Sequence, residues 1–354
     1  MNYLIVFLVG LVSALLLTPL AMRLSHRWGI VAVPGGRRKH RGNIPTLGGV
    51  ALMGAYTTAV FTAYLLFPPT SPADALRLRG VMLGTLVMVI GGLIDDRYEL
   101  SARWQLLSQF VGTAVAMSHI VFIEVFSNPF GGTAVWTNSP LHYLFRVEGD
   151  LIWMWRPLAL LVTLFWIVGM VNAVNMLDGL DGLATGVGTI AAVLFAWHSY
   201  RLGQTAVAAY PLALAGALIG FLLFNFAPAK IFLGAAGASL LGYNLATYAI
   251  LSPAKLSTAL LVLSVPILDV AWQIIARLRR GQSPFHGDRG HLHFRLSDRG
   301  LPTRQIVLGY YVVTAAFGLI AIVAPSGLLK LGLLIGWGTA VLLFLAYLAR
   351  KQTL

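Results

Sequence analysis

Long stretches in which almost every position is apolar alternate with short polar stretches along this chain. A helix that crosses a membrane needs about 20 predominantly apolar residues, and the pattern meets that length repeatedly. We expect a bundle of about eleven membrane-spanning helices, an all-α polytopic membrane protein, with boundaries soft by several residues. The predicted spans are 3–22, 47–67, 80–94, 104–123, 157–176, 184–202, 206–226, 238–253, 258–276, 305–324 and 330–349.

Composition agrees with this reading. Hydrophobic residues make up 58% of the chain and charged residues 10%, against roughly 25% charged residues in an average soluble domain. Such a composition excludes an ordinary soluble enzyme and a disordered chain, and the absence of cysteine excludes a disulfide scaffold. Because the spans leave only short loops, we expect one integral-membrane domain over residues 1–354.

Basic residues predict the orientation of the bundle. The chain has 25 Lys and Arg against 12 Asp and Glu, an excess that orients a multispanning protein rather than indicating nucleic-acid binding. No basic residue precedes the first span and Arg23 and Arg27 follow it, so we expect the N-terminus outside. The predicted cytoplasmic segments then hold 18 of the 25 basic residues: 23–46, 95–103, 177–183, 227–237, 277–304 and the C-terminal tail. Ten spans, with the tail outside, is the alternative.

Most acidic residues fall on that same face. Seven of the twelve lie there: Asp95, Asp96, Glu99, Asp178, Asp181, Asp288 and Asp298. Carboxylates set flush against helix ends favour chemistry at the membrane surface, whereas a transporter places polar groups near the midplane. Asp269 is the main exception, inside an apolar stretch, and we expect it to pair with a polar group on a neighbouring span.

Two acidic motifs are candidates for catalysis. Asp95 and Asp96 end the third predicted span, where adjacent carboxylates suit a base or a cation site. In the segment 172–183, Asn175, Asp178 and Asp181 are three residues apart and share one face if the segment is helical. Their oxygens suit either a divalent cation or a polar nucleotide.

Two basic segments are candidates for phosphate binding. Arg289, His291 and His293 lie in a polar segment whose alternating histidines suit a loop, and no third ligand completes a zinc site. We expect this loop to bind phosphate or sugar. Lys39 and His40 belong to a basic run before the second span, which anionic lipid headgroups also explain. Together the motifs suggest transfer of a phosphorylated group between a soluble donor and a lipid.

These motifs resemble those of the polyprenyl-phosphate N-acetylhexosamine-1-phosphate transferase family, in its WecA/TagO-like branch, which is related to MraY. The matching blocks are Arg38–Gly49, Asp95–Asp96, Asn172–Leu183, Asn225–Gly242 and Pro284–Leu296. The resemblance implies a bundle of ten or eleven helices with a cytoplasmic active site in the bacterial inner membrane. It also implies transfer of sugar-1-phosphate from a UDP-sugar to undecaprenyl phosphate with release of UMP, dependent on Mg²⁺ or, as an alternative, Mn²⁺.

The resemblance also implies roles for individual residues. The catalytic set is Asp95, Asp96 and Asp181, and the metal-binding set is Asn175 and Asp181. The substrate-binding set is Lys39, His40, Asp178, Phe232, Arg289, His291 and His293. Two separated histidines, instead of three in a row, favour UDP-N-acetylglucosamine over the peptide-carrying donor of MraY-like enzymes. A second copy of the chain as a partner, a lipid-linked sugar transporter and a catalytically silent scaffold stay open as alternatives.

One position departs from the family pattern. After Ile231-Phe232-Leu233-Gly234 the family has an Asp that binds magnesium, whereas this chain has Ala235. Loss of a metal ligand is expected to impair activity at least as much as loss of a supporting residue, about 10–100-fold. A deliberately inactivated variant and a divergent homologue both explain Ala235, and the intact remaining motifs favour the former.

Overall fold

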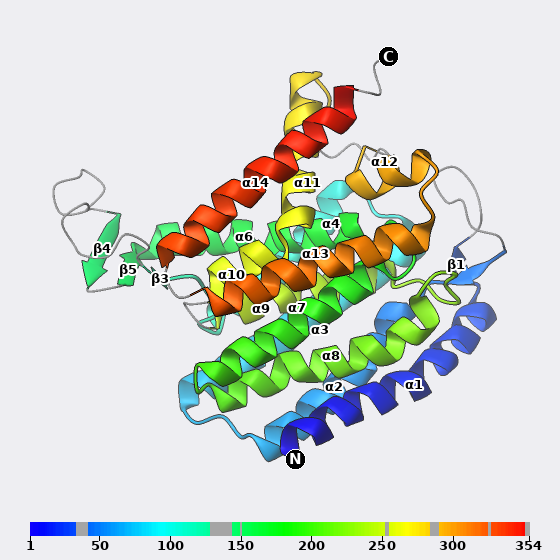
Figure 1. The fold of residues 1–354 in the computed structure, drawn as a ribbon. Helices are drawn as coiled ribbons and strands as arrows, with labels where there is room; N and C mark the ends of the chain where they lie inside the picture. Colours follow the sequence, from blue (N-terminus) through cyan, green and yellow to red (C-terminus); the bar gives the residue numbers. More distant parts are fainter. Residues whose placement is uncertain are drawn as a thin grey trace.

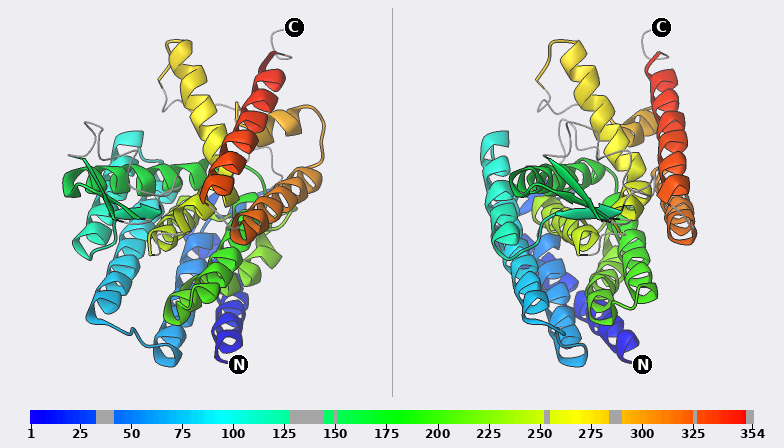
Figure 2. Two further views of the ribbon diagram at one scale, coloured as in Figure 1. Left: turned by 60° about the vertical axis from the view of Figure 1, so that its left-hand side comes forward. Right: turned by 90° about the vertical axis from the view of Figure 1, so that its left-hand side faces the viewer.

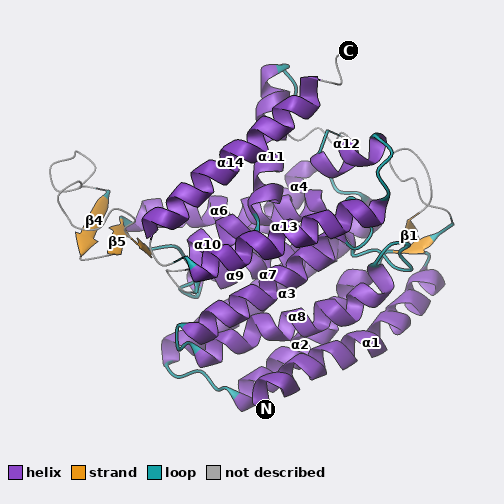
Figure 3. Ribbon diagram, viewed as in Figure 1, coloured by secondary structure: helices purple, strands orange, loops and turns teal. Residues whose placement is uncertain are grey.

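The computed structural model of the chain describes residues 1–32, 42–127, 144–148, 151–251, 255–283, 290–324 and 327–350. The helices are α1 (Asn2–Trp28), α2 (Gly48–Leu66), α3 (Pro72–Tyr98), α4 (Ala102–Ser118), α6 (Arg156–Leu177), α7 (Leu183–Arg201), α8 (Thr205–Asn225), α9 (Gly234–Ile250), α10 (Lys255–Val262), α11 (Ser264–Arg279), α12 (Leu292–Asp298), α13 (Thr303–Val323) and α14 (Gly327–Arg350). The strands are β1 (Val31–Ala32), β2 (Ile44–Pro45), β3 (Val125–Ser127), β4 (Phe145–Glu148) and β5 (Leu151–Met154). Figure 3 shows how strongly helices dominate.

Eight of the helices in the described part of the chain are long and apolar enough to cross a membrane: α1, α2, α3, α6, α7, α8, α13 and α14. This confirms a mainly helical, polytopic membrane protein. The predicted spans 104–123 and 238–253 are the 17-residue helices α4 and α9, which lie at the lower limit for a span. The count of eleven spans and the single domain therefore stay predictions.

The predicted span 258–276 is wrong as a continuous helix. α10 ends at Val262 and α11 begins at Ser264, with Leu263 between them at φ −104° and ψ 19°. Pro266 explains the break, because its ring nitrogen cannot donate to the carbonyl of Val262 four residues earlier. α11 therefore leaves the bundle at a steep angle, together with α14 (Figure 2).

Small residues allow the helices to pack closely. α1 buries one stripe of its surface, and a Cβ added at Gly10 would lie 2.8 Å from the carbonyl oxygen of Ala213 in α8. From the other side, a Cβ at Gly220 would lie 2.5 Å from the carbonyl oxygen of Leu11. Close approach of backbones is the usual way in which membrane helices gain packing contacts, so α1 and α8 form a tight pair.

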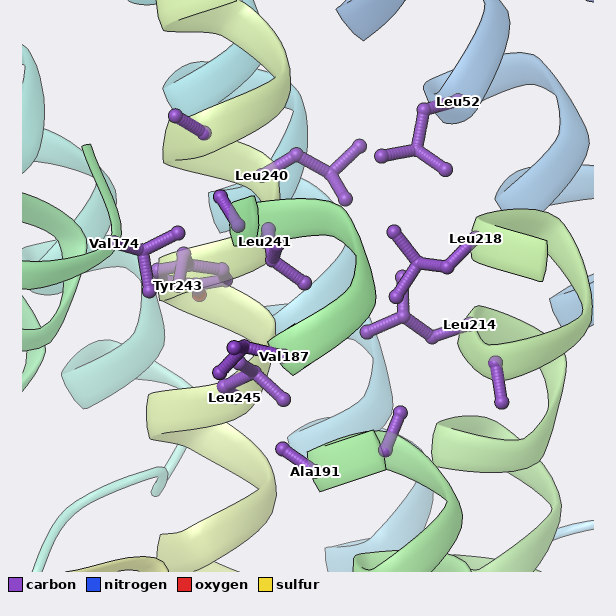
Figure 4. Packing of buried hydrophobic residues seen from close by; sticks show 14 of the residues in the cluster. Leu52, Val174, Val187, Ala191, Leu214, Leu218, Leu240, Leu241, Tyr243 and Leu245 are labelled. Carbon is purple, nitrogen blue, oxygen red and sulfur yellow. The ribbon is translucent and has the colours of Figure 1, made fainter. Parts of the chain in front are cut away.

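The core lies where α7, α8 and α9 meet. Val187 and Ala191 of α7 face Leu241 and Leu245 of α9, with Leu214 of α8 close by (Figure 4). In the most apolar 18-residue stretch of α7, 78% of the chain is buried, against 17% in that of α14. α7 is therefore the central helix, and α14 lies at the periphery, where an apolar surface meets lipid.

Two small antiparallel sheets mark opposite ends of the bundle, and the sequence did not predict them. β1 pairs with β2 near the end where α1 and α3 finish, and β3, β5 and β4 form the second sheet (Figure 1). Both sheets are made of strands of two to four residues, too short to leave an alternating pattern. The end that carries β1, β2 and α12 is the one at which the acidic motifs lie.

Candidate active site

A cavity of about 990 Å³ opens at this end of the bundle. It is lined by the ends of several helices and by the loops that join them, so residues far apart in sequence meet there. The lining residues that carry polar side chains are Thr46, Asp95, Asp96, Arg97, Glu99, Gln105, Asn175, Asp178, Asp181, Asn225, Ser297 and Thr303. The convergence of Asp95, Asp96, Asp178 and Asp181, predicted from their common side of the membrane, is confirmed.

The two acids that end α3 are held in different ways. Asp95 turns toward the start of α4, where its Oδ1 accepts hydrogen bonds from the Leu100 N–H at 2.8 Å and the Gln105 amide at 3.0 Å. Asp96 turns toward α9 and accepts from the backbone N–H groups of Ala235, at 2.8 Å, and Ala236, at 3.1 Å. Asp95 is thus held by the residues that follow α3 in sequence, and Asp96 by α9, which is distant in sequence.

Asp96 acts as a cap for α9 supplied by another helix. The first N–H groups of a helix have no partner within it, and Leu233, which precedes α9, makes no side-chain cap. Gly234 makes the contact possible, because its φ of 74° is left-handed and a Cβ there would lie 2.7 Å from Asp96 Oδ2. A carboxylate at a helix N-terminus is also favoured by the helix dipole.

The segment 172–183 reaches the cavity as a turn and not as a helix. α6 ends at Leu177, Asp178 caps it, and α7 begins at Leu183. The condition under which the three side chains would share one helical face is therefore not met, because the helix ends at Leu177 and Gly182 adopts a left-handed φ of 79°. Asn175, Asp178 and Asp181 nevertheless all line the cavity.

The turn is fixed against its neighbours. Asp181 Oδ2 accepts a hydrogen bond of 2.9 Å from the Ala229 N–H, in the loop between α8 and α9. Nearby, the amide of Asn225 donates to the Ile231 carbonyl at 3.0 Å. The Phe232 N–H donates to the Pro45 carbonyl at 2.8 Å, which joins this loop to β2. Phe232 is one of the residues that line the cavity.

The cavity is electrostatically crowded. Burial raises the pKa of Asp178 well above the usual range of an aspartic acid, and the neighbouring carboxylates of Asp96 and Asp181 raise that pKa further. At least one proton or cation is thus favoured within the cluster. No three His, Asp or Glu side chains among the described residues form a group that could hold a metal ion by themselves.

The histidine segment lies beside the cavity. His293 packs on Phe294, with ring centroids 4.2 Å apart, and only Phe294 lines the cavity. A Cβ added at Gly179 would collide with His293 Nε2 and lie 2.7 Å from Phe294 Cζ. His293 is thus placed against the turn that carries Asp178, whereas the Nδ1 of His291 lies 2.9 Å from Asp269 Oδ2, and both of those side chains are buried.

Comparison with known proteins shows the family. Residues 78–253 match the family described as "Glycosyl transferase family 4". A "Probable undecaprenyl-phosphate N-acetylglucosaminyl 1-phosphate transferase" of Bacillus subtilis is 31% identical over 337 residues, which cover 94% of this chain and 87% of that protein. This chain belongs to glycosyl transferase family 4.

Other relatives have similar names. A "Decaprenyl-phosphate N-acetylglucosaminephosphotransferase" of Mycobacterium tuberculosis is 35% identical over 88% of this chain and 81% of that protein. An "Undecaprenyl-phosphate alpha-N-acetylglucosaminyl 1-phosphate transferase" of Escherichia coli is 28% identical, again over 88% of this chain and 81% of the relative. The family expected from the motifs is therefore confirmed along most of the chain.

Several predicted residues of this family 4 chain take other positions. Lys39, His40 and Arg289 lie outside the described residues, so their predicted roles stay predictions. Asp269 was expected to pair with a neighbouring span, which is wrong. It contacts His291 and the N–H of Leu292, because the segment before α12 folds back against α11.

Sequence reasoning missed part of the site. Gln105, which holds Asp95, is a single amide in a helix that otherwise presents mostly apolar side chains outward. The stretch 29–32 and Thr46 reach the cavity through the pairing of β1 with β2. Thr303 lies at the first position of α13. Polar residues within one turn of a helix end on the acidic face are the signal that would have indicated Gln105 and Thr303.

Proposed function

We propose that this chain transfers N-acetylglucosamine-1-phosphate from UDP-N-acetylglucosamine to a polyprenyl phosphate, with undecaprenyl phosphate as acceptor, releasing UMP. The observation that carries the proposal is the cavity in which Asp95, Asp96, Asp178 and Asp181 converge from α3 and from the α6–α7 turn. Relatives along most of the chain are named for this reaction. The reaction is the first lipid-linked step of cell-envelope polysaccharide synthesis, and we place it at the cytoplasmic face of the bacterial inner membrane.

In this proposal the acids of α3 have separate roles. Asp95 orients the attacking lipid phosphate or accepts its proton, and its two hydrogen bonds hold the carboxylate in one direction. Asp96 fixes the start of α9 and presents negative charge to the cavity. Direct attack by the lipid phosphate is favoured over a covalent enzyme intermediate, because that phosphate is already an anion and needs little activation.

The turn between α6 and α7 binds the nucleotide. The raised pKa of Asp178 favours the protonated carboxyl group, which can donate a hydrogen bond to a phosphate oxygen. Phe232 offers its ring to the uracil from the wall of the cavity. Lys39, His40, Arg289, His291 and His293 complete the proposed set of donors for phosphates and for the N-acetyl sugar.

Mg²⁺ is the proposed cofactor, with Mn²⁺ as an alternative. The donor set fits a hard cation, because Asn175 and Asp181 line a cavity in which the carboxylates of Asp96 and Asp181 raise the pKa of Asp178. Mg²⁺ commonly binds through one or two carboxylates plus substrate phosphates, which agrees with the lack of a three-residue cage among the described residues. When bound, the ion would neutralise the diphosphate and stabilise the leaving UMP.

The decisive experiment uses purified protein in detergent. UDP-N-acetylglucosamine, undecaprenyl phosphate and Mg²⁺ are supplied and released UMP is measured, with UDP-N-acetylmuramoyl-pentapeptide as the donor that an MraY-like enzyme would use. Release of UMP only with the first donor supports the proposal. If neither the present chain nor Ala235→Asp releases UMP with any UDP-sugar, the proposed transferase function is wrong and a transporter is favoured.

Ala235 supports a second candidate, a protein that binds the nucleotide sugar without turnover. The residue lines the cavity beside Asp96 but offers no side-chain oxygen. Nucleotide binding measured by calorimetry, without UMP release, would favour this silent member of the family. Rescue of turnover by Ala235→Asp would exclude it. A homodimer stays an expectation from the resemblance.

A further inference from the structure

α11 carries a buried polar stripe that the proposed chemistry does not use. Asp269, Gln273 and Arg277 follow one another at intervals of four residues and are 5%, 0% and 2% exposed. The opposite side of the helix exposes Ile275 and Leu278. Buried polar groups at the level of a membrane are costly unless they are paired, so the stripe indicates a specific partner.

The partner is the segment that leads into α12. Asp269 contacts it at two points: Oδ2 lies 2.9 Å from His291 Nδ1, and Oδ1 accepts the Leu292 N–H at 3.0 Å. One turn further along α11, the amide of Gln273 donates to the carbonyl of Gly290. The same carbonyl accepts from Arg295 Nε at 2.5 Å. Three consecutive residues, 290–292, are therefore anchored from α11 and α12.

A chain of contacts continues from this anchor to the acidic turn. The rings of His291 and His293 are stacked, with centroids 5.9 Å apart and planes 10° apart. His293 and Phe294 lie against Gly179, with no room for a Cβ between them. Gly179 lies between Asp178 and Asp181 in the turn. A displacement at His291 is thus transmitted through packed side chains to the carboxylates.

We propose that Asp269 is a positioning residue that, through the His291–His293 stack, holds the 178–181 turn in its cavity-facing conformation. The expected effect of Asp269 on turnover rests on the proposed function, whereas its effect on the conformation of the turn does not. A carboxyl oxygen placed 2.9 Å from His291 Nδ1 also favours the tautomer in which Nδ1 is the donor, as carboxylate–histidine pairs do elsewhere. In this role Asp269 supports the site and touches neither the substrate nor the reacting atoms.

Hydrogen–deuterium exchange measures this without requiring turnover. The variants are Asp269→Ala, which removes both contacts, and Asp269→Asn, which keeps an acceptor for the Leu292 N–H but places an amide donor against His291 Nδ1. The matched control is Asp74→Asn, an acid in the first turn of α3 at the opposite end of the bundle, where the Ser71 hydroxyl caps the helix by accepting the Asp74 N–H. Exchange is read in peptides covering residues 175–184 and, as an internal reference, residues 2–28.

For Asp269→Ala we expect exchange of the 175–184 peptide to rise about tenfold, because the turn opens locally more often once its anchor is lost, with residues 2–28 unchanged. For Asp269→Asn we expect kcat to fall about 10–100-fold, and KM for the UDP-sugar to stay within about a factor of three. In a His291→Ala background, Asp269→Asn should cost little more, since a residue that acts only through His291 has nothing left to act on.

Unchanged exchange of the 175–184 peptide in Asp269→Ala would overturn the proposal, as would full additivity with His291→Ala. If Asp269→Ala does not fold, Asp269→Asn decides, because it preserves the shape of the side chain. Absence of UMP release from the present chain and from Ala235→Asp alike would instead count against the proposed function. In that case the exchange result still decides the role of Asp269.

Discussion

Asp96→Asn tests whether a carboxylate from α3 stabilises the start of α9. In the present chain both oxygens of Asp96 accept backbone N–H groups, from Ala235 at 2.8 Å and from Ala236 at 3.1 Å. Asparagine has nearly the same shape but only one oxygen, so its NH₂ group faces one of the two N–H donors. The substitution therefore removes one hydrogen bond and the negative charge, and leaves the packing in place.

The magnitude follows from these two losses. A negative charge at a helix N-terminus contributes about 0.3–1 kcal/mol when exposed and up to about 2 kcal/mol when partly buried. A lost hydrogen bond contributes about 0.5–1.5 kcal/mol. Because Ala235 borders the cavity, water can reach the freed N–H and reduce the cost. We expect the start of α9 to lose about 1–2 kcal/mol, a factor of about 5–30 in its local opening equilibrium.

Hydrogen–deuterium exchange of the peptide 232–240 is the assay, and Asp95→Asn is the control. Asp95 is the adjacent acid on the same helix, but its hydrogen bonds go to Leu100 and Gln105 and not to α9. Faster exchange by about 5–30-fold in Asp96→Asn alone is the expected outcome. Equal protection in both variants, or the same loss in both, would refute the cap.

Three further predictions concern the cavity. Ala235→Asp supplies a carboxylate beside Asp96, and UMP release should rise at least tenfold; the same rate as in the present chain would remove position 235 from the metal-site argument. Gly179→Ala forces a methyl group against His293 and should destabilise the turn by about 1–3 kcal/mol, lowering nucleotide affinity in calorimetry, whereas Gly169→Ala, at a position with open space, should leave affinity unchanged. Finally, folding raises the pKa of Asp178, so in EDTA the folded state keeps this proton to higher pH than the unfolded state does. Thermal stability should therefore fall as pH rises above the usual aspartate pKa of about 3.9. Asp178→Asn should make the melting temperature depend less on pH, and an equal pH dependence in both proteins would contradict the prediction.

Much of the helical bundle was predictable, because a membrane span needs a long apolar stretch and little else. The break at Leu263 was not foreseen, although Pro266 carried the information. It is easily overlooked in a sequence, since proline is tolerated within many membrane helices, including at Pro19 of α1 and Pro211 of α8 in this chain. The difference lies in tertiary contacts: α11 turns away to bring Asp269 to the segment before α12.

The site was predictable as a group of residues but not as a geometry. Alternation of spans across the membrane places Asp95 and Asp178 on one face, whichever local conformation they adopt. The direction in which each carboxylate points depends on partners from other helices, such as the Ala235 N–H for Asp96 and the Ala229 N–H for Asp181. Backbone donors look alike in any sequence, so no residue pattern reveals such pairs.

The same partners explain how a membrane protein holds several acids in one cavity. Asp96 accepts two backbone N–H groups and Asp181 accepts one, so both carboxylates have hydrogen-bond donors from another part of the chain. For Asp178 no such donor is found among the described residues, and burial beside those two charges raises its pKa. The repulsion within the cluster is therefore concentrated on one residue of the turn. Binding of a cation relieves this repulsion, so the electrostatic cost in the free protein becomes affinity for the cation that the proposed reaction requires.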